Sequence, residues 1–571
     1  MRQVGQSGEL STVLRQSAGA FIGVAGISAL ANLLTLTGSF FMLEVYDRVI
    51  PSRSIPTLIG LCVLALVLYA AQSTLEALRA RTLARIGAVL DAEIGPRVFS
   101  LSVQAPLRGA KPDQAGQPLR DLEQVRAFLA GSGPAALFDL PWLPVYVVVC
   151  FLFHPLIGVA AIGGAMLLTS LTLAAELATR SPARSATAHA GRRLALSEAT
   201  RRNAETVAAL GLESRLSRRW AAVNRDHAHA QQRASDIAGG LGAVSKACRM
   251  ALQSGVLALG AYLVINNQAS GGIIIAASIL VARALAPAEL AIANWRVFVA
   301  ARQSWRRLAE ALERHPPARV PLALPEAKLS LSVEGVHVVP PGASRATVHD
   351  VSFQLRAGQG MGVIGPSAAG KSSLVRALVR IWTPLHGRVR LDGADLGQWA
   401  PEHLGAQIGY LPQETELFAG TIAENISRFL PGAPAEAIVE AAQAAGAHDL
   451  ILNLPQGYDT MLGESGAGLS AGQRQRIGLA RALYGDPFLV VLDEPNANLD
   501  AEGENALTQA ILRVRGRGGI CVVVAHRPSA LAAVDHVLMM HEGRVQAFGT
   551  KDEVLKRVLR PAPAPVLRES A

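Results

Sequence analysis

A glycine-rich loop between residues 365 and 373 has the residue types and spacing for phosphate chemistry. Its sequence is Gly-Pro-Ser-Ala-Ala-Gly-Lys-Ser-Ser, and it lies between the apolar run 361–364 and a helical run, 374–380. In this Walker A arrangement, backbone N–H groups surround a phosphate, a lysine binds the β- and γ-phosphates, and a hydroxyl ligates Mg²⁺. We therefore expect nucleotide and Mg²⁺ to bind at Gly365, Ser367, Gly370, Lys371, Ser372 and Ser373.

Two carboxylates follow a second apolar run farther along the chain. Residues 488–492 are all apolar, and Asp493 and Glu494 come directly after them. Parallel sheets bind ligands at the carboxyl ends of their strands, so these side chains should meet the Walker A loop. Asp493 would hold Mg²⁺ through water, and Glu494 would act as the general base that polarises an attacking water.

The composition indicates that a large part of the chain lies in a lipid bilayer. Of the 571 residues, 50% are hydrophobic and only 17% are charged, against about 25% charged in an ordinary globular domain. Disordered, collagen-like and coiled-coil proteins are excluded, and four scattered cysteines exclude a disulfide-stapled secreted domain. Six apolar runs are each near the ~20 residues that a membrane span needs. They cover residues 18–43, 56–78, 135–153, 155–178, 248–265 and 272–291.

Basic residues predict the orientation of these spans. Eight basic residues lie between the second and third runs, and eleven arginines lie between the fourth and fifth. By the positive-inside rule these connections are cytoplasmic, which places both termini in the cytoplasm. Anchoring to the inner leaflet then accounts for the net charge of +10 better than nucleic-acid binding does. The connections keep apolar residues at helical spacing, so we expect them to be helical extensions of the spans.

A proline-rich stretch divides the chain. Residues 315–328 contain four prolines, which cannot continue a helix or a central strand. We expect a transmembrane domain over 1–314, a linker over 315–328, an ATP-binding domain over 329–560 and a disordered Pro/Ala-rich tail over 561–571. In the third segment, short apolar runs alternate with helical stretches, as in a mostly parallel α/β sheet. These runs cover residues 333–339, 360–364, 389–391, 488–492 and 520–525. The predicted fold class is therefore a six-helix membrane domain fused to an α/β P-loop domain.

The segment 469–476, Leu-Ser-Ala-Gly-Gln-Arg-Gln-Arg, resembles the signature of ATP-binding cassette (ABC) proteins. Gln413 then matches the Q-loop, Asp500 the D-loop and His526 the switch histidine. The resemblance implies ATP as the nucleotide, with Gln413 joining Ser372 and Asp493 at Mg²⁺. It also implies that His526 assists Glu494 and Lys371 in hydrolysis. Two cassettes face each other in this family, so Ser470, Gly472 and Gln473 would complete the site of a second copy in a homodimer.

Further motifs resemble one group of ABC exporters. The segments 418–426 and 463–464 are similar to exporter cassettes, in which Glu464 would contact the coupling helices of the partner. The segments 46–51, 390–395, 409–413 and 494–500 resemble bacterial type I secretion permease/ATPases of the protease- and lipase-secreting (PrtD-like) branch. That resemblance implies an inner-membrane exporter of unfolded proteins with a C-terminal signal, acting with a periplasmic adaptor and an outer-membrane channel.

Two other functions share some of these features. An ABC exporter of lipids or small molecules has the same spans and ATP site, but would not bind a periplasmic adaptor. A soluble, DNA-linked ABC ATPase has no six spans and separates its Walker A loop from its signature by long coiled coils. Only about a hundred residues separate the two motifs here, so no nucleic-acid partner is expected.

Two further features carry expectations. Arg283 lies in the sixth apolar run, where a charge usually faces a bundle interior or an aqueous path, and Glu289 would face elsewhere on the same helix. The stretch 329–352 contains no Phe, Tyr or Trp that could stack on a nucleobase. We therefore expect modest discrimination between ATP and GTP.

Overall fold

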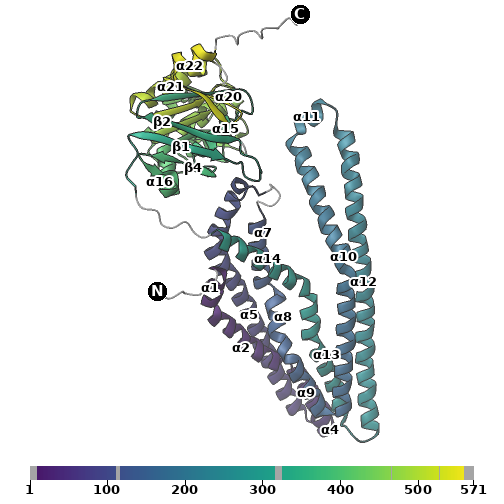
Figure 1. The fold of residues 1–571 in the computed structure, drawn as a ribbon. Coiled ribbons are helices and arrows are strands. Elements are labelled where there is room, and N and C mark those ends of the chain that lie inside the picture. The colour runs from purple at the N-terminus through teal and green to yellow at the C-terminus, as the bar shows by residue number, and fades with distance from the viewer. Residues whose placement is uncertain (1–8, 111–115, 316–323, 464–465, 526–527, 559–571) are drawn as a thin grey trace, which may run out of the picture. The chain divides into compact units, whose positions relative to one another are not determined.

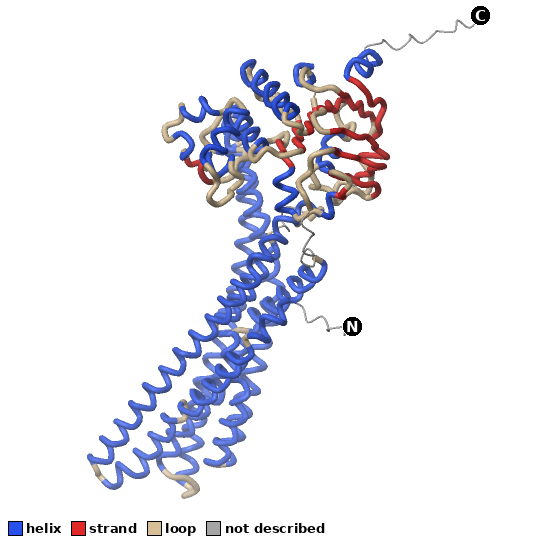
Figure 2. The backbone as a smooth tube through the Cα atoms, turned by 90° about the vertical axis from the view of Figure 1, so that its left-hand side faces the viewer, coloured by secondary structure: helices blue, strands red, loops and turns tan. Residues whose placement is uncertain are grey.

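The chain forms two compact units. The computed structural model describes residues 9–110, 116–315, 324–463, 466–525 and 528–558. A helical unit contains residues 1–102 and 116–315, and a sheet unit contains residues 103–115 and 316–571. Every described strand lies in the sheet unit, as Figure 2 shows. The expected tail over 561–571 falls outside the described residues.

The helical unit confirms six spans. Its candidate membrane segments are Ala18–Ser52, Ile55–Gln104, Ser132–Phe153, Pro155–Arg202, Glu213–Ile265 and Gly271–Ala293. The helices of the unit are α1 (Glu9–Gln16), α2 (Ala18–Leu34), α3 (Thr37–Glu44), α4 (Ile50–Ser52), α5 (Ile55–Gln104), α7 (Gln117–Ala130), α8 (Ser132–Asp139), α9 (Leu143–Phe153), α10 (Pro155–Arg202), α11 (Ala204–Ala209), α12 (Glu213–Ile265), α13 (Gly271–Ala293) and α14 (Trp295–Arg314).

The expected helical extensions are present as single long helices. Helices α5, α10 and α12 contain 50, 48 and 53 residues, well beyond the ~20 that cross a bilayer. Figure 1 shows α10 and α12 running side by side up to the short helix α11. On the extension, α12 turns partly buried residues such as Leu216, Val223 and His227 towards α10, and His227 Nδ1 lies 3.1 Å from the carbonyl oxygen of Ala186. The remaining faces of this pair are exposed.

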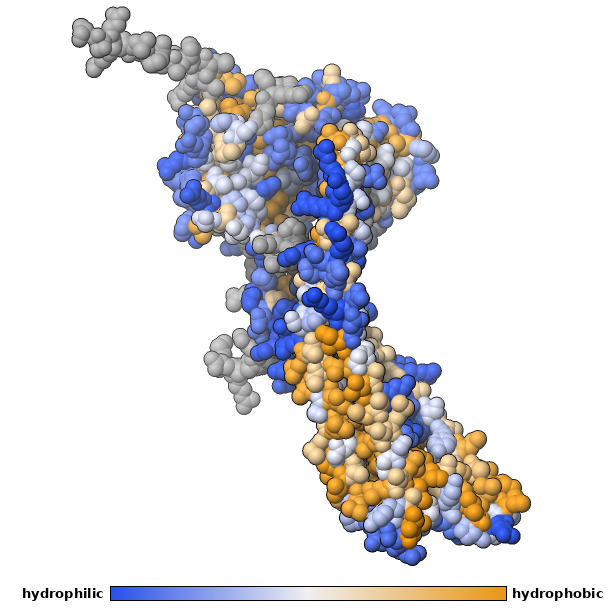
Figure 3. Space-filling model, turned by 90° about the vertical axis from the view of Figure 1, so that its right-hand side faces the viewer, coloured by the Kyte–Doolittle hydropathy of each residue, from blue (hydrophilic) through white to orange (hydrophobic). Residues whose placement is uncertain are grey.

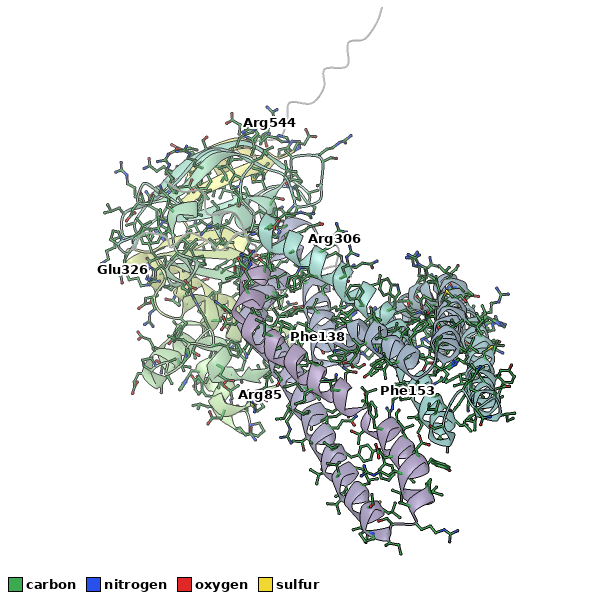
Figure 4. All side chains as sticks on the ribbon, turned by 90° about the horizontal axis from the view of Figure 1, so that it is seen from below. Arg85, Phe138, Phe153, Arg306, Glu326 and Arg544 are labelled. Carbon is green, nitrogen blue, oxygen red and sulfur yellow. The ribbon has the colours of Figure 1, made fainter. Side chains whose placement is uncertain are left out.

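A polar network lies among the spans. The Asp139 carboxylate accepts hydrogen bonds from Asn32 Nδ2 at 2.7 Å and from Arg79 Nη1 at 2.8 Å, and Tyr146 donates to Asn32 Oδ1. Next to Asp139, Phe138 of α8 packs in a cluster with Leu83 of α5 (Figure 4). These bonds satisfy polar groups that would otherwise be costly in a low-dielectric environment. The network therefore holds α2, α5, α8 and α9 together.

The network borders a cavity of about 130 Å³ that Arg283 of α13 also lines. Glu289 points elsewhere, as expected, and pairs with Arg249 of α12 at 3.0 Å. Among the described residues, Arg283 itself has no ion-pair partner.

Asp47 joins the first and sixth spans at one end of the bundle. It lies in a π-helical turn, η1 (Val45–Val49), and its carboxylate accepts from the N–H of Gly272 at 2.8 Å and from the Ser270 hydroxyl. A carboxylate at the N-terminus of α13 satisfies free N–H groups and interacts favourably with the helix dipole. A Cβ at Gly272 would lie 2.8 Å from this carboxylate, so glycine permits the close approach.

The sheet unit contains a six-stranded, mainly parallel sheet. Its strand order is β12-β11-β3-β10-β9-β6. The bounds are β3 (Gly360–Ile364), β6 (Ile408–Leu411), β9 (Leu489–Asp493), β10 (Ile520–Val524), β11 (His536–His541) and β12 (Arg544–Thr550), and only the β11–β12 pair is antiparallel. Alternate residues of β9 enter opposite hydrophobic cores, with Val490 and Leu492 on one side and Leu489 and Val491 on the other. This sheet is therefore covered on both faces, as parallel sheets require.

One prediction about the sheet was wrong. The runs 333–339 and 389–391 were assigned to the mostly parallel sheet, but they form a separate antiparallel sheet of order β2-β1-β4-β5. Its strands are β1 (Ser330–Val338), β2 (Val348–Arg356), β4 (His386–Leu391) and β5 (Ala394–Asp395). An apolar run indicates a buried strand but not the neighbour with which it pairs. The short strands β7 (Gly420–Thr421) and β8 (Met461–Leu462) form a third sheet.

Helices pack on these sheets. They are α15 (Lys371–Leu378), α16 (Pro401–Gln407), α17 (Ile422–Ile426), α18 (Ala435–Ala444), α19 (His448–Leu452), α20 (Ala471–Leu483), α21 (Ala501–Gly516) and α22 (Lys551–Val558). One core joins residues of α18, α20 and α21 to one face of the six-stranded sheet, and the other joins α15 and the antiparallel sheet to the opposite face. The carboxyl ends of β3, β6 and β9 remain available for a site.

Candidate active site

The Walker A loop connects buried strand β3 to helix α15, which begins at Lys371. Gly365 and Gly370 have φ angles of 150° and 92°, in the region that favours glycine. A Cβ at Gly365 would lie 2.2 Å from the carbonyl oxygen of Met540, and one at Gly370 would lie 2.3 Å from that of Thr347. The backbone of Met540 in β11 and of Thr347, just before β2, therefore lies so close to the loop that only glycine fits at these two positions.

Lys371 lies against this loop. It is 6% exposed, and its Nζ donates to the carbonyl oxygens of Gly365 at 2.8 Å and Pro366 at 2.9 Å. Burial lowers the pKa of Lys371 because it disfavours the charged form, while the nearby carboxylates of Glu494 and Asp493 oppose this shift. The side chain is therefore held at the loop by bonds that a phosphate oxygen could replace.

Asp493 and Ser372 form a site with the chemistry of a Mg²⁺ ligand pair. The Ser372 hydroxyl hydrogen-bonds to the Asp493 carboxylate, and Asp493 is 2% exposed. Burial raises the pKa of Asp493, and the hydrogen bond from Ser372 opposes that rise. Asp493 Oδ1 is buried without a hydrogen-bond partner among the described residues. Since Mg²⁺ prefers carboxylate, hydroxyl and water oxygens, this free acceptor beside a hydroxyl fits that ion.

Gln413 and Glu494 meet at the same edge of the sheet. Strands β6 and β9 are parallel neighbours, with Leu411 opposite Leu492, so the residues that follow them lie close together. Gln413 Nε2 donates to Glu494 Oε2 at 3.2 Å. Glu494 has a φ of 50°, a left-handed conformation that costs about 1 kcal/mol or more for a residue with a Cβ. The sharp turn brings this carboxylate next to the Q-loop.

The signature segment forms the N-terminus of α20. The Ser470 hydroxyl accepts from the N–H of Gln473 at 3.2 Å, and Gln473 Oε1 accepts from the N–H of Ser470 at 2.8 Å, which is a reciprocal capping box. The Ser470 hydroxyl proton stays available for a phosphate oxygen. In the described part of the chain, no hydrogen bond links Ser470, Gly472 or Gln473 to residues 365–373.

Two residues that were given no role in the sequence analysis connect the signature helix to the rest of the site. Gln475 is 3% exposed, donates to the carbonyl oxygens of Glu494 and Pro495, and accepts from the N–H of Asn498 at 3.1 Å. Both carbonyls and the N–H belong to the turn after β9. The only sequence signal for Gln475 and Arg476 is their position inside the signature segment, because burial of a polar side chain cannot be predicted without knowing its neighbours.

The second such residue is Arg476, which holds the D-loop. Its Nη2 donates to Asp500 at 2.7 Å, and Asp500 also caps α21 by accepting from the N–H of Gly503. The hydrogen bond from the Gly503 N–H is the largest cause that lowers the pKa of Asp500, and the hydrogen bond from Arg476 lowers it further. Asp500 therefore stays ionised and keeps the D-loop fixed to the signature helix.

Two predicted site residues fall outside the described part of the chain. They are the switch residue His526 and the coupling residue Glu464. Strand β10 ends at Val524, beside Asp493 in the register of the parallel sheet. The other predicted residues divide into two groups. Lys371, Ser372, Gln413, Asp493 and Glu494 meet at the carboxyl ends of β3, β6 and β9, together with Gly365, Ser367 and Gly370 of the loop after β3 and Ser373 in the first turn of α15. Ser470, Gly472, Gln473 and Asp500 lie instead at the start of α20 and α21.

Comparison with known proteins agrees with this geometry. The family model described as ABC transporter matches residues 348–497, and the model described as ABC transporter transmembrane region matches residues 21–285. The chain is similar to the type I secretion system ATP-binding protein PrsD of Rhizobium meliloti (strain 1021), with 59% identity over 557 residues that cover 98% of this chain and 96% of the relative.

A more distant relative and a solved structure agree with this comparison. The cyclolysin secretion/processing ATP-binding protein CyaB of Bordetella pertussis is 32% identical over 93% of this chain and 75% of its own length. A solved structure, that of a bacterial Atm1-family ABC exporter with ATP bound, has the same fold with a TM-score of 0.78 at 24% identity, over 95% of this chain and 96% of that one. The chain belongs to the ABC transporter family and, within it, to the type I secretion ATP-binding proteins.

Proposed function

We propose that the protein uses ATP hydrolysis to export a protein across the inner membrane, as the ABC component of a type I secretion system. The observation that carries this proposal is the meeting of Lys371, Gln413, Asp493 and Glu494 at one sheet edge, in a chain that resembles the relative PrsD along nearly all its length.

The site residues divide the work of hydrolysis. Lys371 binds the β- and γ-phosphates, since its ammonium group already lies against the loop that would surround them. Glu494 accepts a proton from the attacking water as the water oxygen bonds to the γ-phosphorus and the bond to ADP breaks. Gln413 holds the Glu494 carboxylate by a hydrogen bond and couples its position to the loop after β6. We assign His526 the role of γ-phosphate sensor from the family resemblance.

Mg²⁺ would be held by Ser372 and Asp493, with Gln413 nearby, and would neutralise charge on the phosphates. The unpartnered Asp493 Oδ1 supports this assignment.

A homodimer would complete two such sites. Ser470 and Gly472 lie at a helix N-terminus, which favours anions, yet no described bond joins them to the Walker A loop of their own chain. We infer that they contact the nucleotide of a second copy. Two exposed leucines at the α11 end of the α10–α12 pair, Leu194 of α10 (65% exposed) and Leu210 in the turn after α11 (66% exposed), also favour burial against another chain.

The remaining assignments follow from the distribution of basic residues, from the proline-rich stretch and, for the protein partners, from the family resemblance. Both termini would lie in the cytoplasm, and the domain limits would be 1–314, 315–328 and 329–560, with a tail over 561–571. The partners would be a periplasmic adaptor, an outer-membrane channel and a secreted protein with a C-terminal signal. Membrane lipid would surround the six spans.

An export assay tests the function. Cells that produce wild-type protein should secrete a substrate that carries its C-terminal segment, and Glu494→Gln should abolish secretion. Glu436→Gln is a matched control because Glu436 is an exposed carboxylate of the same unit, remote from the site. Adaptor that co-purifies with the wild-type protein would support the secretion role. A protein that exports lipid from vesicles, without adaptor or secreted protein, would overturn it.

Complementation tests the shared sites. A Ser470→Arg chain and a Lys371→Ala chain, carrying different tags, are co-expressed and isolated through both tags. If each site uses two chains, every mixed dimer has one intact site, and ATPase activity should return to as much as about half of wild type. Mixed dimers as inactive as each parent variant would show that each site lies within one chain.

A further inference from the structure

A line of arginines follows the cytoplasmic extension of α12. At 100° per residue, Arg215, Arg218, Arg225, His229 and Arg233 fall within an arc of roughly 80° on one face of this helix. All five side chains are exposed. We call these five residues the arginine stripe. It lies roughly 140° around the helix from the face that packs on α10, which includes Leu216, Val223 and His227.

Two exposed carboxylates lie near the stripe, Asp236 on the same face three residues after Arg233 and Asp226 about 20° outside its arc, but neither forms an ion pair with it in the described part of the chain. None of its four arginines forms an ion pair, although Arg201, Arg249 and Arg296 elsewhere in the unit each do. Between Arg215 and Arg233 the sequence has five arginines and one acidic residue, Asp226. Arg215 and Arg218 are three residues apart, and like charges at this spacing destabilise a helix by about 0.2–0.5 kcal/mol. A bound polyanion would remove this repulsion.

The stripe lies too far from the bilayer for lipid to be that polyanion. The fifth apolar run begins at residue 248, so Arg233 lies about 22 Å and Arg215 about 50 Å beyond it along the helix. The headgroup layer adds only ~6 Å to the hydrocarbon core, and the surface potential decays over about 8–10 Å. Lys246 and Arg249 lie close enough to the bilayer to interact with lipid headgroups of the inner leaflet, but the stripe does not. Figure 3 shows a column of hydrophilic side chains above the hydrophobic surface of this unit.

Part of the stripe has the spacing of an extended polypeptide. Arg225, His229 and Arg233 are four residues apart, about 6 Å along the helix axis, which is close to the ~6.6 Å between alternate residues of an extended chain, whereas the two intervals before them are about 4.5 and 10.5 Å. Single-stranded nucleic acid would need aromatic side chains for its bases, and Trp220, the one Phe, Tyr or Trp between Arg215 and Arg233, falls roughly 180° around the helix from the stripe and donates to the Ser197 hydroxyl. We propose that the arginine stripe binds an extended, acidic polypeptide segment before export. This inference rests on the proposed function, because it names the substrate class.

Peptide binding to the full-length protein in nanodiscs tests the inference. The probe is a fluorescein-labelled peptide of about 16 residues, twice the ~8 that span the stripe, with glutamate alternating with glycine or serine. A second peptide has glutamine in place of glutamate, and an oligothymidylate of equal charge is the third probe. We expect binding of the acidic peptide alone, measured by fluorescence anisotropy.

Three variants locate the binding. Arg218→Gln/Arg225→Gln/Arg233→Gln should raise the Kd of the acidic peptide by at least about tenfold, because three charge contacts are lost. The matched control, Arg192→Gln/Arg202→Gln/Arg219→Gln, removes three exposed arginines of the same helix pair that lie off the stripe and should change Kd less than about twofold. Arg218→Lys/Arg225→Lys/Arg233→Lys should retain binding. Unfolding midpoints equal to wild type show that each variant is folded.

Three outcomes would overturn the inference. They are equal losses in the stripe and control variants, equally tight binding of the glutamine peptide, and equally tight binding of the oligothymidylate. The export assay separates this inference from the proposed function. A protein that secretes its substrate but binds no acidic peptide overturns the stripe alone, whereas a protein that binds the peptide but secretes nothing overturns the secretion role.

Discussion

The two units of the chain exclude water in different ways. In the sheet unit, all five residues of β9 and of β10 are buried within the unit itself. In the helical unit, the most apolar window of Ile55–Gln104 is only 6% buried and that of Gly271–Ala293 is 50% buried. The sheet unit therefore completes its own core, whereas the helical unit depends on lipid and, in our proposal, on a second copy.

This difference determines where charge can be placed. In the sheet unit, the buried Lys371 and Asp493 meet at the edge of a complete hydrophobic core, so their charges are available to bind nucleotide and Mg²⁺. In the helical unit, the buried charge of Asp139 is matched by Arg79 and serves packing. The predictions below test that contrast.

The largest effect is expected from Glu494→Gln in the sheet unit. The variant keeps Lys371 and Asp493 for nucleotide binding but removes the proton acceptor, so kcat should fall by about 10²–10⁴-fold. Kd for ATP should change little, and Lys371→Ala should instead weaken binding. Steady-state hydrolysis and nucleotide-binding titrations provide these values. Hydrolysis by Glu494→Gln at the wild-type rate would remove Glu494 from the mechanism.

The next largest effect is expected in the helical unit. The side chains of Arg79 and Asp139 are 16% and 12% exposed, so Asp139→Ala would leave an uncompensated charge and cost about 3–5 kcal/mol. The variant should therefore unfold at a lower denaturant concentration in detergent micelles. In the sheet unit, Glu440 pairs with Arg513 at the surface, where both side chains are about half exposed, and Glu440→Ala should cost less than about 1 kcal/mol.

A double variant controls for the lost charge in that experiment. Arg79→Leu/Asp139→Leu removes both ions and should recover part of the stability lost by Asp139→Ala. If the double variant were less stable than Asp139→Ala, the Asn32 and Tyr146 bonds rather than the ion pair would dominate.

The sequence predicted elements whose signal is local. Six spans were found because each apolar run is long enough by itself, and the Walker A loop because strand, glycines and lysine are contiguous. The antiparallel sheet was missed because β1 pairs with β4 across about 50–60 residues, and the pairing of strands is not a local property. The bridge from Gln475 to the turn after Glu494 was missed for the same reason. Long-range contacts of single polar side chains leave no periodic signal.

A smaller effect is expected at Arg283. This side chain is exposed and lines the 130 Å³ cavity next to Arg79 and Asp139. In a background with all four native cysteines replaced by alanine, Arg283→Cys should react with a water-soluble thiol reagent at least about tenfold faster than Leu280→Cys, because Leu280 is fully buried. If the thiol introduced by Arg283→Cys were protected from the reagent in every nucleotide state, position 283 would not lie on an aqueous path.

The smallest effect is expected in the choice of nucleobase, although the base lies in the well-packed sheet unit. The carbonyl oxygen of Thr347, the residue before β2, lies close to Gly370, which places the end of the β1–β2 pair beside the Walker A loop. An aromatic side chain there could stack on the base, a contact that contributes about 1–3 kcal/mol per base in nucleic-acid complexes. The chain after β1 has Pro340 instead, and the His337 ring lies edge-on to His386 with centroids 5.9 Å apart. ATP affinity therefore rests on the phosphate and Mg²⁺ contacts, which ATP and GTP share.

We expect hydrolysis rates at subsaturating concentration to differ only modestly between the two nucleotides, and Pro340→Tyr to raise the affinity for both. An ATP preference above about a hundredfold, roughly 2.7 kcal/mol, would mean that another residue recognises the base.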